Sequence, residues 1–414
     1  MNIFNNKSPI GFHRGWAVVV VTFLSAALAI GSSNYAFGLF VEPLAEEFGW
    51  TRTYISASLS FMALGSLTSP FMGNLMDRYG AKPIMVSSLL IMSIGFALRP
   101  LMTELWHWYC LSALQFGALN GAAIFPAGRL VGLWFPKTRG RVMGMTMMGN
   151  NFGGLTLPIL IGLAIGSHSA WEIAYIYVAG AALIFAVISF VVVREPSTNK
   201  IEQKNVQVAN KTLDNTTWLF RDLLKSPTFY AIALAIMLGN FTYTTILGHV
   251  FAHLVDIDIS ETSAALCLTV LAGCGMFGKV ILGYFTEKIQ TRFVMMVCFV
   301  GQICGIILIL LIGNGLGIWF AFGLFGFFMG SFGALVPLLV QDSFGLKSFG
   351  TIMGVISATT VISFGFGPIL AGLSYDLLGS YRVAFILVAI MFGIATFILN
   401  WAKQNKNLKT ETVN

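Results

Sequence analysis

Charged residues are scarce in this chain. Only 10% of its 414 residues are Asp, Glu, Lys or Arg, whereas soluble proteins contain about 25%. Hydrophobic residues make up 57% of the chain, and its mean hydropathy is +0.81. This composition excludes an ordinary soluble domain, because so much apolar surface has to face lipid.

Cysteine is also scarce, and the signatures of several catalytic classes are missing. All five cysteines lie in apolar segments without metal-ligand spacing, so we expect neither disulfides nor a zinc site. They are Cys110, Cys267, Cys274, Cys298 and Cys304. The chain has no P-loop glycine pattern for ATP, and its His and carboxylate residues do not cluster at catalytic spacing. We therefore expect no enzyme activity and no cofactor.

Long apolar segments take up most of the chain. Twelve of them are long enough to cross about 30 Å of hydrocarbon as helices, and lipid excludes open strands because it offers the backbone no hydrogen bonds. The expected spans are 15–40, 54–76, 83–101, 107–133, 141–165, 172–193, 228–254, 262–285, 292–312, 317–341, 349–373 and 380–401. The sequence therefore predicts an all-α membrane protein with twelve transmembrane helices.

The second half of the chain repeats the first at an offset of 210 residues. The run from Gly73 to Gly80 returns around Gly283, and in both copies an acidic-basic pair begins four residues after the glycine. Other matches at this offset are Gly140 with Gly350, Met143 with Met353, Gly144 with Gly354, and Pro158 with Pro368. Solenoid repeats are only about 20 to 50 residues long. The repeat therefore indicates two fused six-helix bundles.

A polar stretch separates the two copies. Residues 194–227 form the only long polar segment of the chain. We expect an N-terminal six-helix bundle at 1–193, a cytoplasmic linker at 194–227, a C-terminal six-helix bundle at 228–401 and a cytoplasmic tail at 402–414.

The positive charges predict the orientation. If both termini are cytoplasmic, 19 of the 24 Lys and Arg residues lie on that side, three lie outside (Arg52, Arg99, Arg382) and two lie within spans (Arg129, Lys279). This is the positive-inside distribution of a multi-pass protein. It explains the net charge of +7 through topology and lipid contact, without nucleic acid. The first apolar stretch is too long for a cleaved signal, so we expect a retained span in the inner (cytoplasmic) membrane.

The loop Gly73-x-x-x-Asp77-Arg78-x-Gly80-x-Lys82, its degenerate second copy and the twelve-helix layout together resemble the major facilitator superfamily. The stretches 37–40, 47–56 and 134–140 further resemble the monocarboxylate porter group and its bacterial relatives, which include oxalate–formate exchangers. The resemblance implies two bundles around a central cavity that opens alternately to each side, with small carboxylates as cargo.

Lys279 is the main candidate for binding such a cargo. It precedes Glu287 by eight residues, so it lies about 12 Å from the cytoplasmic loop along a helix. So deep a cation suggests a functional site, and snorkelling of the long side chain is the alternative. In the resemblance, a basic residue at this place pairs with the substrate carboxylate.

Two positions depart from the pattern of these porters. An aspartate one turn before the basic residue is replaced by Gly275, which puts proton symport by that route in doubt. The second cation of the oxalate exchangers is missing from 353–363. A monoanion held by one cation is therefore favoured over a dianion.

Charged residues near the two repeated loops form a candidate gate. A carboxylate at Asp77 can cap a helix of the opposite half, a contact worth about 0.3–1 kcal/mol, and the resemblance implies a latch that favours the outward-open state. Arg129 pairs with Asp77, contacts the anion or snorkels toward the membrane interface. The other alternative for Asp77 is a solvated turn. The expected gating residues are Gly73, Asp77, Arg78, Gly80, Arg129, Glu287 and Lys288.

Several uncharged polar residues lie within the spans expected to line the cavity. A pocket for a small acid needs a few donors among apolar walls, although each of these residues could instead bond a neighbouring helix. The substrate-binding candidates besides Lys279 are Asn34, Tyr35, Asn151, Tyr243 and Thr359. His249 could carry a proton in place of the missing aspartate, or pair with His253 at the outer interface.

We therefore predict a secondary carrier of a small monocarboxylate such as lactate, pyruvate or formate. It would run as a proton symporter or an anion exchanger, in contact with lipid and as a monomer. Two alternatives remain, namely a carrier of the same fold for another solute, such as a drug or an amino acid, and a membrane sensor that does not transport.

Overall fold

The computed structural model describes residues 10–168, 171–196, 218, 220–312 and 315–403. Within these residues the chain contains helices and no strands. Twelve helical segments of the described chain are long and apolar enough to cross a membrane. The predicted all-α architecture with twelve transmembrane helices is confirmed.

Each half contributes six of the twelve membrane-spanning segments of the described chain. The first half contains α1 (Ile10–Ile30), η1 (Gly31–Tyr35), α2 (Gly38–Phe48), α3 (Arg52–Ala57), η2 (Ser58–Phe61), α4 (Met62–Tyr79), α5 (Ala81–Ala97), η3 (Arg99–Leu101), α6 (Leu105–Ala122), α7 (Ile124–Trp134), α8 (Arg139–His168) and α9 (Trp171–Val192). The second contains α11 (Phe220–Leu223), α12 (Pro227–Gly239), η4 (Thr242–Leu247), α13 (Gly248–Asp256), α14 (Glu261–Thr286), α15 (Thr291–Ile312), α16 (Gly317–Phe344), α17 (Phe349–Thr359), α18 (Val361–Leu378), α19 (Arg382–Ile398) and η5 (Leu399–Trp401).

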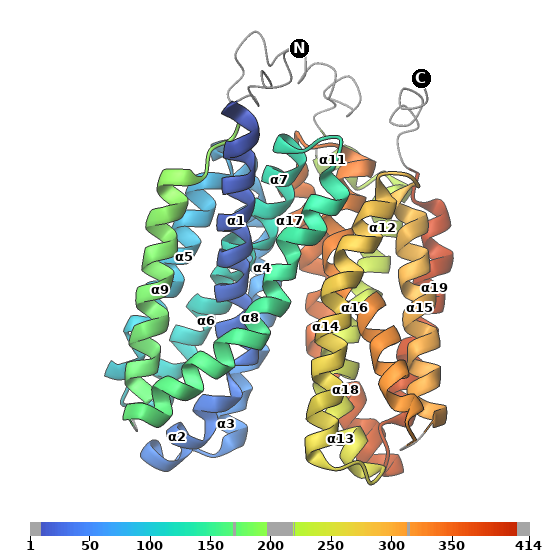
Figure 1. Cartoon of the computed structure of the whole chain (residues 1–414). Helices are drawn as coiled ribbons and strands as arrows, with labels where there is room; N and C mark the ends of the chain where they lie inside the picture. Colours follow the sequence, from blue (N-terminus) through green and yellow to red (C-terminus); the bar gives the residue numbers. More distant parts are fainter. Residues whose placement is uncertain (1–9, 169–170, 197–217, 219, 313–314, 404–414) are drawn as a thin grey trace, which may run out of the picture.

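The two halves lie side by side, α1 to α9 in blue to green and α12 to α19 in yellow to red (Figure 1). We call the end of the molecule where α1 begins and α19 ends the termini end, and the opposite end the far end. Across the halves, α4 packs against α17 and α8 packs against α14. At the far end, α2 and α3 lie well apart from α13 (Figure 1). The molecule is therefore closed at the termini end, and its halves part toward the far end.

Glycines allow the halves to meet backbone to backbone at the termini end. A Cβ atom on Gly73 of α4 would lie 1.9 Å from the carbonyl oxygen of Gly350 on α17. In the other interface, a Cβ atom on Gly140 of α8 would lie 2.0 Å from the carbonyl oxygen of Gly283 on α14. Small residues are what lets membrane helices approach so closely. The two contacts involve the same repeat positions, 210 residues apart.

The next turn of each interface repeats this pattern. A Cβ atom on Gly354 would lie 2.4 Å from the carbonyl oxygen of Ser69, and one on Gly144 would lie 2.3 Å from the carbonyl oxygen of Lys279. Ser69 and Lys279 are also 210 positions apart. The sequence repeat therefore produces two equivalent helix contacts between the halves. At these two positions only the α8–α14 contact has a charged side chain, that of Lys279.

Stacked aromatic rings fill the core of each half. Such ring pairs contribute beyond the apolar area that they bury. In the first half Phe40 and Phe96 stack on Tyr175, and in the second half Phe299 packs against Phe332 and Phe392.

A π-helical turn ends the first span of the first half, and another lies within the first span of the second half. These turns are η1, which carries Asn34 and Tyr35, and η4, which carries Tyr243. Wide turns of this kind occur often at functional sites. Within their halves, η1 packs against α8, and η4 packs against α18 and α19.

Arg99, one of the three cations expected on the outer side, is a buried residue of η3. It is only 3% exposed, and its guanidinium donates to Tyr175 Oη (2.6 Å) and to Gln115 Oε1. The ring of Trp108 lies 4.2 Å from its Cζ. The planar guanidinium is buried because neutral acceptors and an aromatic face replace its water.

Candidate functional site

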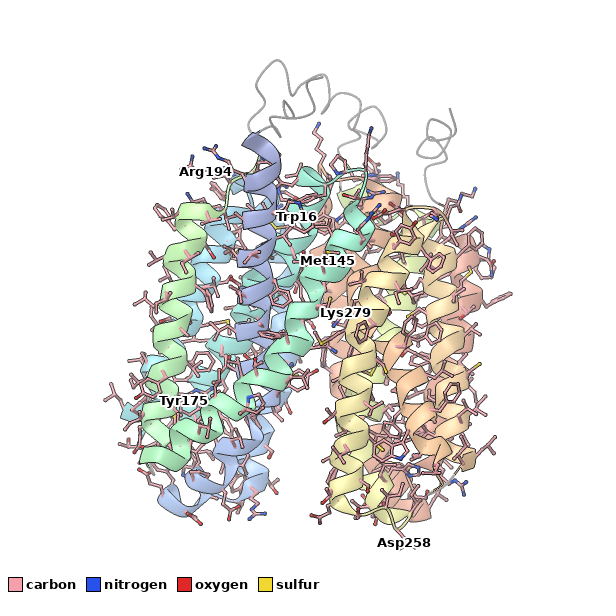
Figure 2. The ribbon with its side chains drawn as sticks, in the orientation of Figure 1. Trp16, Met145, Tyr175, Arg194, Asp258 and Lys279 are labelled. Carbon is pink, nitrogen blue, oxygen red and sulfur yellow. The ribbon has the colours of Figure 1, made fainter. Side chains whose placement is uncertain are left out.

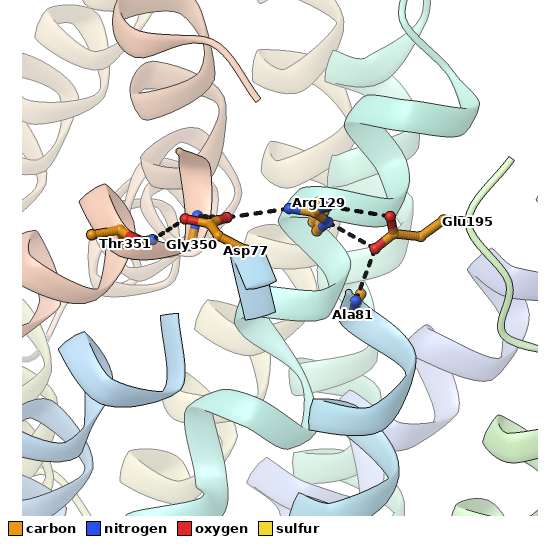
Figure 3. Close-up of polar contacts among 6 residues, drawn as sticks. All are labelled: Asp77, Ala81, Arg129, Glu195, Gly350 and Thr351. Atoms are coloured by element: carbon orange, nitrogen blue, oxygen red, sulfur yellow. Dashed lines mark hydrogen bonds and ion pairs between the residues drawn. The ribbon is translucent and has the colours of Figure 1, made fainter. Parts of the chain in front are cut away.

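Asp77, near the C-terminal end of α4, crosses the boundary between the halves (Figure 3). Its Oδ1 accepts a hydrogen bond from the Gly350 N–H (2.8 Å), and its Oδ2 accepts one from the Thr351 N–H (2.6 Å). These groups belong to the first turn of α17, which lacks intrahelical acceptors and attracts negative charge. The structure thus contains the cap from the opposite half that the sequence predicts, while the gating role stays a prediction.

Arg129 of α7 extends this contact away from the boundary (Figure 3). Its guanidinium pairs with Asp77 Oδ1 (3.2 Å) and with Glu195 Oε1 (2.7 Å). Glu195 also accepts from the Ala81 N–H (2.8 Å) and so caps α5. Just before α5, Gly80 has a φ of +91°, which an L side chain rarely adopts. Of the three alternatives for Arg129, the ion pair with Asp77 is the one present in the structure.

The second copy of the loop makes the matching contact in the opposite direction. Glu287, the C-cap residue of α14, accepts from the Arg141 N–H (2.9 Å) and from Arg141 Nη2 (2.8 Å), so it caps α8. Lys288 and Arg78 take no part in the described ion pairs. The Lys288 ammonium lies 4.8 Å from the Tyr284 ring centroid, and Arg78 is exposed.

A further ion pair joins the halves beside these caps. Arg139 at the start of α8 donates to Asp342 near the end of α16, and the same carboxylate accepts from Thr291. Asp342 is only 8% exposed. We name Asp77, Arg129, Arg139, Arg141, Glu287 and Asp342 the termini-end latch. Neither Asp342 nor Glu195 lies in a motif, so only a tertiary structure could reveal these partners.

Lys279 lies about half-way along the molecule, where α14 meets α8 (Figure 2). It is only 4% exposed, and its ammonium donates to Asn151 Oδ1 on α8. None of the ion pairs of the described residues includes Lys279. The ammonium therefore faces the opposite half instead of reaching the membrane interface, as snorkelling would require.

Asn34 and Tyr35 keep polar atoms available at η1. The Asn34 Oδ1 atom is buried and has no hydrogen-bond partner in the described chain. Tyr35 is 42% exposed, and its ring lies flat against α8, where a Cβ atom on Gly154 would be 2.9 Å from three ring carbons. A buried acceptor without a partner is costly, so Asn34 Oδ1 is free to accept a hydrogen bond from a neighbouring group.

Tyr243 and Thr359 instead use their hydroxyl groups within their own half. Tyr243 Oη donates to the Met329 carbonyl oxygen of α16 (3.4 Å), and Thr359 Oγ1 donates to the Ala233 carbonyl oxygen of α12 (3.4 Å) as well as to the Ile356 carbonyl oxygen of its own helix (2.7 Å). These are the helix contacts named as their alternative role.

His249 belongs to α13, a helix of the far end (Figure 1), whereas Lys279 lies about half-way along the molecule (Figure 2). Its Nδ1 atom is 3.1 Å from the Thr245 carbonyl oxygen, and its ring is 5.5 Å from that of Tyr381. His253, one turn later, packs edge-on against Phe385. The two histidines therefore lie among aromatic rings of α19 and its N-cap, apart from the central lysine.

The model of the Major Facilitator Superfamily matches this chain over residues 22–360 and again over 256–412. The chain belongs to the major facilitator superfamily. Members of this superfamily are transporters rather than enzymes, so the chain is a multi-pass membrane transporter of small solutes.

Curated members of the superfamily match almost the whole chain at low identity. MFS-type transporter 1 of Ophiocordyceps sp. (strain BCC 1869) is 25% identical, over 95% of this chain and 88% of its own length. Human monocarboxylate transporter 12 is 22% identical, over 99% of this chain and 84% of its own length. The uncharacterized MFS-type transporter YcxA of Bacillus subtilis (strain 168) is 23% identical, over 92% of this chain and 94% of its own length.

Solved superfamily structures share the fold. The proton:xylose symporter XylE superposes with a TM-score of 0.78 at 14% identity, covering 95% of this chain and 97% of XylE. The human organic anion transporter MFSD10 superposes with a TM-score of 0.71 at 16% identity, covering 93% of this chain and 99% of MFSD10. At these low identities the similarity to the solved structures shows a shared fold and nothing more.

Proposed function

We propose that this transporter is a secondary carrier of a small monocarboxylate of the lactate, pyruvate or formate type. It would work by alternating access, as a proton symporter or an anion exchanger. One observation carries the proposal: the Lys279 ammonium is buried between the halves, and its bonded partner is a neutral amide. The name of monocarboxylate transporter 12, a relative over the full length, supports the substrate class.

The charge of the site favours one carboxylate per cycle. A buried ammonium beside an amide is not neutralised, and burying an uncompensated charge is costly. A monoanion would neutralise Lys279 completely, whereas a dianion would leave one negative charge unpaired. Asn34 and Tyr35 would supply further polar contacts. The other residues of the proposed binding site are Asn151, Tyr243 and Thr359. If transport is coupled to protons, His249 or another titratable group would carry them.

The termini-end latch would set which side is open. With both termini in the cytoplasm, as the positive charges predict, this structure is the outward-open form, with Asp77 and Glu287 capping helices across the closed cytoplasmic side. Inward opening would break both caps and the Arg139–Asp342 pair. We propose that the carrier resides in the inner membrane as a monomer, with bundles at 1–193 and 228–401 and cytoplasmic segments at 194–227 and 402–414.

Uptake into liposomes tests the proposal. The purified protein is reconstituted into vesicles loaded with pyruvate, and uptake of labelled lactate, pyruvate, formate and oxalate is followed with and without an inward proton gradient. We expect uptake of at least one monocarboxylate, and we expect Lys279→Gln to abolish it. Lys225→Gln, at an exposed lysine before α12, is the matched control and should transport normally.

The pattern of uptake separates the alternatives. A gradient-dependent rate indicates symport, and dependence on internal pyruvate indicates exchange. Uptake of no acid by folded protein would refute the monocarboxylate proposal, and flux of a neutral or cationic solute that survives Lys279→Gln would identify a different carrier. A protein that binds a ligand without flux would be a sensor.

A further inference from the structure

The Asn151 amide makes two hydrogen bonds across the boundary between the halves. Its Oδ1 atom accepts from the Lys279 ammonium, and its Nδ2 atom donates to the Ala272 carbonyl oxygen (2.8 Å). Both partners belong to α14, seven residues apart, which is about two helical turns. The side chain therefore ties α8 to two successive turns of the opposite half.

This amide also covers the ammonium. Asn151 is 7% exposed and Lys279 is 4% exposed. A Cβ atom on Gly275 would lie only 3.2 Å from Asn151 Nδ2, so the amide occupies space that a side chain at position 275 would otherwise take. The amide oxygen holds one of the three ammonium donors, so a carboxylate that takes this position must displace Asn151.

An anion has the chemical advantage in such a displacement. The hydrogen bond from the ammonium to the amide is charge-assisted on the donor side only, whereas a carboxylate adds the Coulomb attraction between two opposite charges. The amide oxygen is a neutral acceptor, so a carboxylate forms the stronger partner for the same ammonium. The exchange removes a polar bond between α8 and α14, the helices whose closer contact at Gly140 and Gly283 keeps the termini end closed.

We infer that Asn151 is an internal competitor of the substrate and a trigger of opening. In the empty carrier it holds the Lys279 ammonium and links the halves. The substrate carboxylate displaces it, and the loss of this link favours separation of α8 from α14 at the termini end. Asn151 is thus a positioning residue. The inference rests on the proposed function, because it takes Lys279 as the anion site.

Two substitutions at this position should change anion affinity in opposite directions. Asn151→Leu removes the competing bond at similar volume, so the dissociation constant should fall by roughly 10- to 100-fold, the range expected for one hydrogen bond to a charged group. Asn151→Asp places a permanent carboxylate on the ammonium, so the dissociation constant should rise at least tenfold. A residue that only supports packing would shift both variants the same way.

The measurement is isothermal titration of the purified full chain with pyruvate, lactate and formate. Asn150→Leu is the matched control, because Asn150 precedes Asn151 on α8 and makes no hydrogen bond to Lys279 in the described structure. The control should bind like the wild type. A spin-label distance between α4 and the α16–α17 loop should also report a larger fraction open at the termini end in Asn151→Leu without substrate.

The outcomes separate this inference from the proposed function. Weaker binding by Asn151→Leu, with wild-type binding intact, would mean that Asn151 is itself a ligand of the substrate, and the inference would be overturned while the carrier proposal stands. Unchanged binding by Asn151→Asp would overturn it as well. No binding of any acid by the folded wild type would overturn both. Tighter binding by Asn151→Leu together with loss in Asn151→Asp supports the inference.

Discussion

Replacing Asp77 by Asn should shift the molecule away from its closed termini end. The carboxylate accepts two backbone hydrogen bonds from α17 and pairs with Arg129, and the two charged side chains are only 13% and 15% exposed. An Asn side chain keeps one acceptor oxygen and loses the charge. Hydrogen bonds to charged groups contribute about 1.5–3 kcal/mol each. We expect a change of about 2–3 kcal/mol, which is roughly a 30- to 150-fold shift in the conformational equilibrium.

Spin-label distances measure this shift directly. Asn74 on α4 and Lys347 between α16 and α17 are both exposed near the latch and belong to different halves. With the five cysteines replaced and labels at these two positions, Asp77→Asn should add a population at longer distance. The same change at Asp222, an exposed aspartate in α11, is the matched control. An unchanged distance distribution in Asp77→Asn would refute the latch role of this carboxylate.

Three further predictions follow from the helix contacts. Gly144→Val should lower uptake at least tenfold, because its Cβ atom would lie 2.3 Å from the Lys279 carbonyl oxygen, whereas Gly393→Val, with nothing within 4 Å, should leave uptake unchanged. Arg99→Met should destabilise the first half by about 2 kcal/mol, because it leaves buried phenol and amide partners unpaired, and a thermal unfolding curve in detergent would measure this. Ser69→Lys should raise oxalate uptake relative to formate uptake, because it places a second cation at the position equivalent to Lys279. A competition assay between the two acids in liposomes measures this ratio, and an unchanged ratio would contradict the prediction.

The sequence was sufficient for the features that depend on local pattern. The twelve spans follow from runs of apolar residues, and the 210-residue repeat predicts the equivalence of the Asp77 and Glu287 loops. Asp77 as a helix cap could also be predicted, because a carboxylate in a repeated short loop has few other partners in a closed bundle. The depth of Lys279 follows from its distance to the end of its helix.

The partners of these residues could not be predicted, because they come from other helices. Asn151 is one of several polar residues in the spans, and only the register of α8 against α14 places it on the Lys279 ammonium. Glu195 and Asp342 likewise acquire their roles through contacts with Arg129 and Arg139. The burial of Arg99 could not be predicted either, because its partners Tyr175 and Gln115 belong to α9 and α6.

Duplication of the bundle supplies the closing contacts twice but the central cation once. At the position equivalent to Lys279, the Ser69 hydroxyl donates to the Gly65 carbonyl oxygen of its own helix (2.6 Å), so the α4–α17 interface is already satisfied there. The α8–α14 interface instead holds an ammonium against an amide. It follows from the proposed role of Lys279 that an anion acts directly on only one of two equivalent interfaces. The α4–α17 interface must then open because each half moves as a rigid body. The caps of Asp77 and Glu287 should therefore open together, although only Glu287 lies on α14, the helix that carries Lys279.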